Sequence, residues 1–163
     1  MLITCDTNII IDFSKINHLY LLKDIFKNVI IASEVEEELL AGEEKITKEL
    51  DIKKAINEWI KVKMVENKLA LESLKIHIGA GEAASIILYM ETNADLLAIN
   101  DLKARGVASA MGVKIIGTLG ILRLAKDRGI LKQIKPLLDE LRKVGAYISD
   151  SLYNRMLKDV REI

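Results

Sequence analysis

The sequence predicts an α/β fold of three layers (α/β/α), in which a central parallel sheet lies between two layers of helices. Short and nearly continuous apolar runs occur at residues 2–5, 28–32, 95–100 and 113–117, as expected for strands that are covered on both faces. Segments with helical spacing separate these runs. Such alternation of strands and helices is typical of parallel sheets.

Helix signals occur between these runs. Ser33 and Glu36 have the spacing of a capping box, which predicts a helix that begins at Ser33 and runs towards Gly42. From Ile52 to Ile60, apolar residues recur at intervals of three and four, which predicts a second, amphipathic helix.

The C-terminal third contains further helix signals. Thr118 is a residue type that caps helices, and Gly129 follows the helix that would begin there. Pro136 and Gly145 suit the first turn and the end of the next helix. Residues 146–163 are predicted to form a helical tail that packs on the domain or on a partner.

Length and composition indicate one globular unit. The chain has 163 residues, with no internal repeat and no linker-like stretch, so we expect a single domain over residues 1–163. No apolar run approaches the roughly 20 residues that cross a bilayer. The start of the chain does not have the features of a signal peptide, and Cys5 has no second cysteine with which to pair. We therefore expect a cytoplasmic protein without a membrane partner.

The net charge limits the function classes. Lys plus Arg number 24, and so do Asp plus Glu, which gives a formal net charge of zero. A protein that coats nucleic acid is usually basic, so this balance argues against a packaging role. It leaves open an enzyme that holds one short strand with a local basic patch.

Acidic residues follow two of the predicted strands. Asp6 ends the first strand, and Asp101 comes directly after residues 95–100. In parallel sheets ligands bind outside the carboxyl ends of the strands, where the strand order switches, so the two acids are expected to converge. Each acid also precedes a helix, and Asp is a favoured N-cap, so a purely structural role explains either one equally well.

Two further acids lie at helix positions that suit a site. Glu38 is one turn beyond Val35 and borders the apolar face of its helix, although a solvated role is the simpler interpretation. Glu82 opens a helix directly after Gly79-Ala80-Gly81, where an acid also stabilises the helix start. Converging carboxylates repel one another unless a cation lies between them. Hard oxygen ligands suit Mg²⁺ or Mn²⁺, which activate water for phosphodiester hydrolysis.

Several short motifs, in order, resemble those of PIN-domain proteins, the family that includes VapC-like toxin ribonucleases. They are Asp6-Thr7-Asn8, Val35-Glu36-Glu37-Glu38-Leu39, Gly79-Ala80-Gly81-Glu82, Asn100-Asp101 and Gly117-Thr118-Leu119-Gly120. The last three are similar to one poorly characterised PIN-like branch. The resemblance runs from Asp6 to about Gly129.

The resemblance implies a PIN-like fold and an Mg²⁺- or Mn²⁺-dependent ribonuclease. It assigns the catalytic and metal-binding roles to Asp6, Glu38, Glu82 and Asp101. It also implies that Asn8, Arg105 and Thr118 contact the RNA substrate, although a salt bridge would explain Arg105 equally well. Related chains often have two adjacent Asp residues where this one has Asn100-Asp101, so metal affinity is expected to be weaker if the first position contributes charge.

The family resemblance also implies partners. A toxin ribonuclease has a protein antitoxin, and PIN-like chains form homodimers. Candidate dimer surfaces are an apolar helical hairpin before Met64 and the C-terminal tail over residues 146–163.

Other function classes remain open. Gly79 to Ala84 fit a dinucleotide-binding glycine pattern, with residues 74–78 as the preceding strand, but Glu82 would then lie beside the pyrophosphate. A phosphatase of the haloacid-dehalogenase type would need a second Asp where Asn8 stands. A third possibility is an inactive PIN-like scaffold that binds RNA or protein, since a fold does not fix a function.

Overall fold

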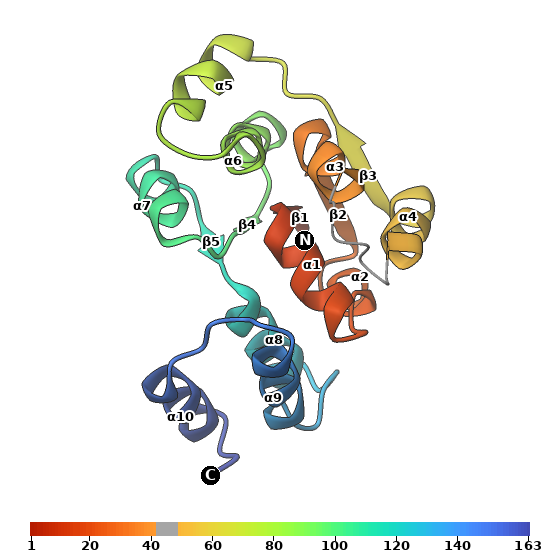
Figure 1. The fold of residues 1–163 in the computed structure, drawn as a ribbon, viewed down its shortest axis with the longest axis vertical. Helices are drawn as coiled ribbons and strands as arrows, with labels where there is room; N and C mark the ends of the chain where they lie inside the picture. Colours follow the sequence, from red (N-terminus) through yellow and green to blue (C-terminus); the bar gives the residue numbers. More distant parts are fainter. Residues whose placement is uncertain (42–48) are drawn as a thin grey trace.

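A parallel sheet of five strands, in the order β3-β2-β1-β4-β5, forms the centre of the fold. This is a computed structural model, and it describes residues 1–41 and 49–163 (Figure 1). The strands are β1 (Leu2–Cys5), β2 (Asn28–Ala32), β3 (Ile60–Lys63), β4 (Leu96–Ala98) and β5 (Ile115–Ile116). The chain moves outward from β1 to β3 and then crosses back to β4, so the strand order switches between β1 and β4.

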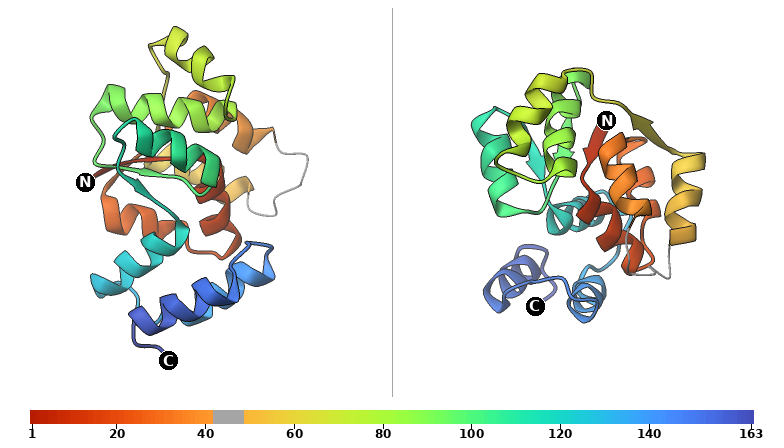
Figure 2. Two further views of the ribbon diagram at one scale, coloured as in Figure 1. Left: turned by 90° about the vertical axis from the view of Figure 1, so that its left-hand side faces the viewer. Right: turned by 45° about the horizontal axis from the view of Figure 1, so that its top comes forward.

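Helices cover both faces of the sheet, which confirms the predicted α/β/α fold class. Helices α1, α2 and α8 lie on one side of the sheet, and α6 and α7 lie on the other (Figures 1 and 2). In the described residues the helices are α1 (Thr7–Lys15), α2 (Tyr20–Phe26), α3 (Ser33–Leu40), α4 (Glu49–Glu58), α5 (Lys68–Lys75), α6 (Ala80–Thr92), α7 (Leu102–Ala110), α8 (Thr118–Asp127), α9 (Lys135–Lys143) and α10 (Asp150–Asp159). Within that same part of the chain, none of these helices is both long and apolar enough to cross a membrane.

The core is almost entirely aliphatic. The central strands β1 and β2 bury nearly every residue, because helices press on both of their faces. Helix α6 is buried over most of its length, from Ala83 to Leu88, because it packs against β1, β2 and β4 and also contacts α3. The first turn of α6 is therefore held rigidly at the carboxyl end of the sheet.

The edge strand β3 is the main departure from the predicted elements. The helix predicted over residues 52–60 ends at Glu58, and Ile60 instead pairs with Val29 in the sheet. Exposed Lys61 and Lys63 alternate with more buried residues along β3, as is common on edge strands. Residues just before Met64 therefore form a strand, and the helices α3 and α4 precede it in the chain.

Two predicted strands are longer than the assigned ones, although sheet hydrogen bonds continue beyond the assigned ends. The backbone N–H of Asp95 donates to the carbonyl of Leu2 at 2.9 Å, and that of Ile99 donates to Ile116 at 2.9 Å. The pairing therefore extends to the residue directly before Asn100.

Two predicted helix caps are wrong. Ala32 is the N-cap of α3, and the hydroxyl of Ser33 donates to its neighbour Glu34 at 3.2 Å instead of capping. Gly117 is the N-cap of α8, so Thr118 is the first helical residue and its hydroxyl is free to bond elsewhere. Gly42, where the first of these helices was predicted to end, lies outside the described residues.

The carboxylate of Glu162 connects the C-terminal helices through hydrogen bonds. Glu162 accepts hydrogen bonds from the N–H groups of Ile134 and Lys135, both at 2.8 Å, and from the Lys126 ammonium at 2.6 Å. Burial favours the neutral form of this acid, but these three donors hold the pKa of Glu162 below its usual range. The end of the chain thereby caps α9 and ties it to α8. Pro136 lies in the first turn of α9, as predicted.

Replacing Glu162 by Gln is expected to loosen the C-terminal helices selectively. The amide cannot accept all three donors as strongly as the carboxylate does, and we expect a loss of about 2 kcal/mol in the local stability of α9 and α10. Hydrogen exchange resolved by peptide measures this loss directly. Glu140→Gln, at an exposed position of α9, is the matched control. Equal protection of α9 in the two variants would contradict the anchoring role.

Candidate functional site

Asp6 lies at the carboxyl end of β1, at the point where the strand order switches. Its backbone N–H donates to the carbonyl of Ala98 at 3.0 Å, which holds it between β1 and β4. The residue is only 2% exposed, and within the described part of the chain its Oδ1 atom has no hydrogen-bond partner. Asp6 occupies the N-cap position of α1, but its side chain makes no capping hydrogen bond. Capping alone therefore does not account for this acid.

Burial and neighbouring acids make the Asp6 carboxylate unusually basic. Burial is the larger cause and raises the pKa of Asp6 to about 7, with the N–H of Thr7 acting in the opposite direction. The negative charges of Glu82, Glu38 and Asp101 contribute to this rise in the pKa. The structure thus brings the predicted acids near enough to repel one another.

Glu38 is held in place by both of its carboxylate oxygens. Oε1 accepts a hydrogen bond from the N–H of Gly81 at 2.9 Å, and Oε2 accepts one from the hydroxyl of Thr7 at 2.5 Å. A Cβ atom at Gly81 would overlap the Glu38 carboxylate, so a larger residue there would displace this carboxylate from its present position. These contacts fasten Glu38 to the beginnings of α1 and α6.

Glu82 and Asp101 each stabilise the first turn of a helix. Glu82 accepts from the N–H of Gly79 at 3.0 Å, and Asp101 accepts from the N–H of Ala104 at 2.9 Å. Burial raises the pKa of Glu82, the N–H of Gly79 lowers it, and the charges of Asp101 and Glu38 add to the rise. Each capping bond uses only one oxygen, so a cap and a ligand role are compatible for both acids.

The acids act on one another electrostatically but do not form a ready-made metal cage in the described residues. Across residues 1–41 and 49–163, no three Asp, Glu, His or Cys side chains are close enough to hold one ion together as they are oriented here. Mg²⁺ usually keeps several waters and takes one or two carboxylates directly. The unpartnered oxygen of buried Asp6 and the all-oxygen donor set fit such an ion.

Asp12 is a further acid at the same end of the sheet, and the sequence analysis did not identify it. Its Oδ2 atom accepts from the side-chain amide of Asn100 at 3.0 Å and from the hydroxyl of Thr118 at 2.9 Å. Burial raises the pKa of Asp12, while the hydrogen bonds from Thr118 and Asn100 and the charge of Lys15 lower it. The sequence signal that could have identified Asp12 is its position as the one acid of α1, next to three isoleucines.

Both the nitrogen and the oxygen of the Asn100 side-chain amide make hydrogen bonds. Its Nδ2 also donates to the Thr118 hydroxyl at 2.8 Å, and its Oδ1 accepts from the Thr118 N–H at 2.9 Å. An ionised Asp at position 100 would have no proton to donate to Asp12. An Asn at position 100 therefore matches the acid that it faces.

A groove of about 890 Å³ runs from this end of the sheet to the C-terminal helices, and we call it the sheet-end groove. Predicted site residues Asn8, Asp101, Arg105 and Thr118 all line it. Nη1 of Arg105 donates to the carbonyl of Ile99 at 3.0 Å, so a backbone contact, and no salt bridge, fixes this side chain within the described residues. Asp12 and Asn100 also line this groove, together with Gly117, Tyr147, Leu152 and Arg155 among others.

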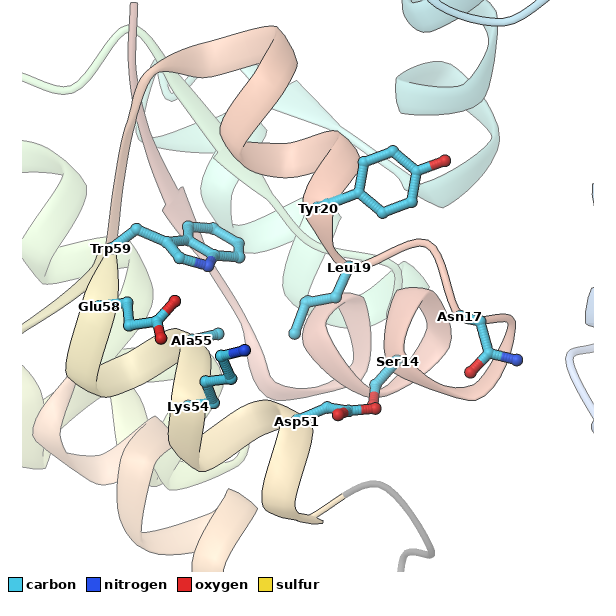
Figure 3. Close-up of a pocket in the computed structure, with 9 residues that line it drawn as sticks. All are labelled: Ser14, Asn17, Leu19, Tyr20, Asp51, Lys54, Ala55, Glu58 and Trp59. Atoms are coloured by element: carbon cyan, nitrogen blue, oxygen red, sulfur yellow. The ribbon is translucent and has the colours of Figure 1, made fainter.

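A second hollow, of about 280 Å³, lies at the opposite end of α1 from Asp6 (Figure 3). Leu19, Trp59 and Tyr20 supply its apolar lining, and Lys54 is among its charged residues. The buried hydroxyl of Ser14 has no hydrogen-bond partner in the described residues. None of the predicted site residues lines this hollow. Asp101 lines the sheet-end groove, whereas the acids Asp6, Glu38 and Glu82 are not among the residues that line it.

The dinucleotide alternative loses its structural basis. Residues 74–78 would have to form the strand before the glycines, but α5 runs through Lys75. The Gly79–Gly81 turn thus follows a helix, whereas the dinucleotide pattern requires a strand there. This interpretation is wrong.

Comparison with known families agrees with the geometry. A family model described as "PIN domain" matches residues 2–162, nearly the whole chain, including the C-terminal helices. No curated protein and no solved structure gives a significant match. The chain belongs to the PIN-domain family, whose members are generally nucleases.

Asp6→Asn is expected to stabilise the metal-free protein at pH 8 by about 2 kcal/mol. The pKa of Asp6 is about 7 when folded and near 3.8 when unfolded, so between these values the folded chain binds more protons. Stability therefore falls as pH rises from about 4 to about 7. The variant lacks this contribution of Asp6 to the pH dependence of stability. Because the pKa values of Asp12 and Glu82 are also raised, some pH dependence remains.

Chemical denaturation in EDTA at a series of pH values measures this effect. Asp24→Asn, at an exposed position of α2, is the matched control and should follow the wild type. If wild type and Asp6→Asn lose stability in parallel between pH 5 and 8, the buried charge is not the cause.

Proposed function

We propose that this PIN domain is a metal-dependent endoribonuclease that hydrolyses RNA phosphodiester bonds. One observation carries the proposal: the buried, unpartnered carboxylate of Asp6 lies at the strand-order switch with Glu38, Glu82 and Asp101 around it. Unpaired charge in such a place is costly to the fold, and a cation would relieve that cost. The position is where parallel α/β sheets bind ligands.

The metal ligands in this proposal are the carboxylates of Asp6, Glu38, Glu82 and Asp101. Their hard oxygen donors suit Mg²⁺ or Mn²⁺ and do not suit metals that prefer thiolate or imidazole. When bound, such an ion activates water and stabilises the leaving oxygen in phosphodiester hydrolysis.

The chain's own residues hold the acids and the strand. Gly81, Thr7 and the N–H groups of Gly79 and Ala104 fix three of the carboxylates, which limits reorganisation when a substrate binds. Arg105 lines the groove beside Asp101 and offers its remaining donors to a phosphate. Asn8 and Thr118 line the same groove and would contact the RNA backbone.

An inactive scaffold that binds RNA or protein is the second candidate. The observation that favours it is that Glu82 and Asp101 already stabilise helix starts, which gives both acids a structural reason to be present. The side chain of Asp6 makes no capping hydrogen bond, so helix capping does not explain its presence. The activity assay below separates the two candidates.

A toxin role is a finer proposal that rests on the nuclease. It implies a protein antitoxin that blocks the site. We further propose that the chain forms a homodimer, with the helices α3 and α4 before Met64 as the candidate surface, because the C-terminal segment lines the sheet-end groove. Co-expression with the neighbouring gene product and measurement of molar mass in solution test these points.

Wild-type protein is expected to cut single-stranded RNA in Mn²⁺, and Asp6→Asn is expected to reduce the rate by at least about 100-fold. Removing the buried carboxylate removes the ligand at the centre of the site. Denaturing gels of end-labelled RNA, structured and unstructured, give the rates.

Asp24→Asn should cut like the wild type, and EDTA should stop both proteins. Cleavage that survives in Asp6→Asn would indicate a contaminating nuclease or another site. Binding of RNA without any cleavage would favour the scaffold.

Mn²⁺ is expected to raise the melting temperature of the wild type by about 5–10 °C at a hundredfold excess over its Kd. The ion binds only the folded site and relieves repulsion among the acids. Asp6→Asn should lose most of this shift, and Asp24→Asn should keep it. Melting curves that do not change up to 10 mM Mn²⁺ would count against a metal site.

A further inference from the structure

We propose that the segment from Tyr147 to Arg155 forms an RNA-binding wall of the sheet-end groove, which holds the single-stranded nucleotides next to the scissile phosphate. The inference rests on the proposed nuclease function and names the part of the chain that holds the RNA. It gives the start of α10 and the loop before it a role in substrate binding.

The groove connects Asp101, one of the four proposed metal ligands, to this segment. Asp101, at one end, belongs to the acid cluster, and Leu102 and Arg105 on α7 continue from it along the groove. Tyr147 and Arg155 line the same groove from the C-terminal segment. A strand whose phosphate lies at the acids would therefore pass between α7 and the C-terminal segment.

Arg155 supplies an uncommitted positive charge. It is exposed on α10, and within the described residues its guanidinium makes no hydrogen bond or ion pair. Arg105 is already oriented by the carbonyl of Ile99, at 3.0 Å. With two guanidinium groups, the groove offers two positive groups that can each contact a backbone phosphate.

Apolar side chains are exposed in the same groove. Tyr147 is 93% exposed and Leu102 is 84% exposed, and both line the groove. Bases of a single strand stack on such surfaces, whereas bases inside a duplex are not accessible to them. These residues favour single-stranded RNA over a duplex.

The wall is fixed before any ligand binds. Arg142 donates from Nη2 to the carbonyl of Ile148 at 2.9 Å, and its guanidinium lies 4.1 Å from the ring centroid of Tyr153. The N–H of Ala146 donates to Leu141 at 2.9 Å. The residues on either side of Tyr147 are therefore anchored, which lowers the entropy lost when a base stacks on it.

The charges of the groove favour RNA over a peptide. An acidic peptide would meet Asp12 and Asp101, and a basic peptide would meet Arg105 and Arg155. A phosphate strand whose metal ion lies at the acidic end satisfies both groups of charges. The groove therefore suits RNA with its divalent ion.

Fluorescence anisotropy with a labelled, unstructured RNA of 12 nucleotides tests the wall. The full chain is titrated in Ca²⁺, and gels verify that the RNA stays intact. We expect Tyr147→Ala and Arg155→Ala each to raise Kd about 5- to 10-fold, because each removes a stacking or phosphate contact. Tyr147→Phe keeps the ring and should bind within about twofold of the wild type.

Matched controls separate the wall from general effects. Lys158→Ala removes a positive charge from an exposed position of the same helix, and Tyr20→Ala removes a half-exposed tyrosine far along the chain. Both should bind like the wild type. Thermal melting checks that every variant folds.

The outcomes distinguish this inference from the nuclease proposal. RNA cleavage that depends on Asp6 but is unchanged in Tyr147→Ala and Arg155→Ala, with unchanged Kd, overturns the wall and keeps the nuclease. Loss of RNA affinity in these variants without cleavage by the wild type supports the wall and overturns the nuclease. A wild type that binds no RNA overturns the wall.

Discussion

The burial of Asp6 is the constraint on which the rest of the site depends. Its carboxylate is 2% exposed and has an oxygen without a partner in the described residues, and burial, together with the acids nearby, raises its pKa. A fold rarely keeps such a group without a use, because desolvated charge costs stability. The neighbouring parts of the structure hold the other acids in place around it: Gly81 leaves room for Glu38, and Thr7 donates to Glu38. The repulsion that results favours a bound cation.

Capping and metal binding do not compete at this site. Glu82 and Asp101 each give one oxygen to a backbone N–H, and that bond fixes the direction of the carboxylate. A ligand oxygen that is already oriented loses less entropy when a metal or substrate arrives. The sequence alone could not decide whether these two acids cap helices or bind a ligand. In the structure the capping bond is what positions each acid, so the two roles are compatible. Asp6 is different, because no cap bond holds its side chain.

How well the sequence predicts each part depends on how local the determining contacts are. Strands β1 and β2 are buried on both faces, so their residues form continuous apolar runs that are visible in the sequence. Edge strand β3 is half exposed, and its short alternation merges with the helical period of α4, so it was missed. Asp6 and Asp101 were predictable because parallel strands end at one edge. Asp12 was not, because Asn100 and Thr118, which define its role, lie 88 and 106 residues away.

The Asp12–Asn100–Thr118 cluster also bears on why Asn stands at position 100. Two ionised acids at positions 12 and 100 would face each other without a shared proton, whereas the Asn100 amide donates to Asp12 at 3.0 Å. The cluster joins α1, the end of β4 and the first residue of α8, which are the elements that form the floor of the sheet-end groove. A negative charge is still present there, carried by Asp12 from another helix. Asn100 therefore avoids a repulsion next to Asp101 without leaving this end of the sheet short of carboxylates.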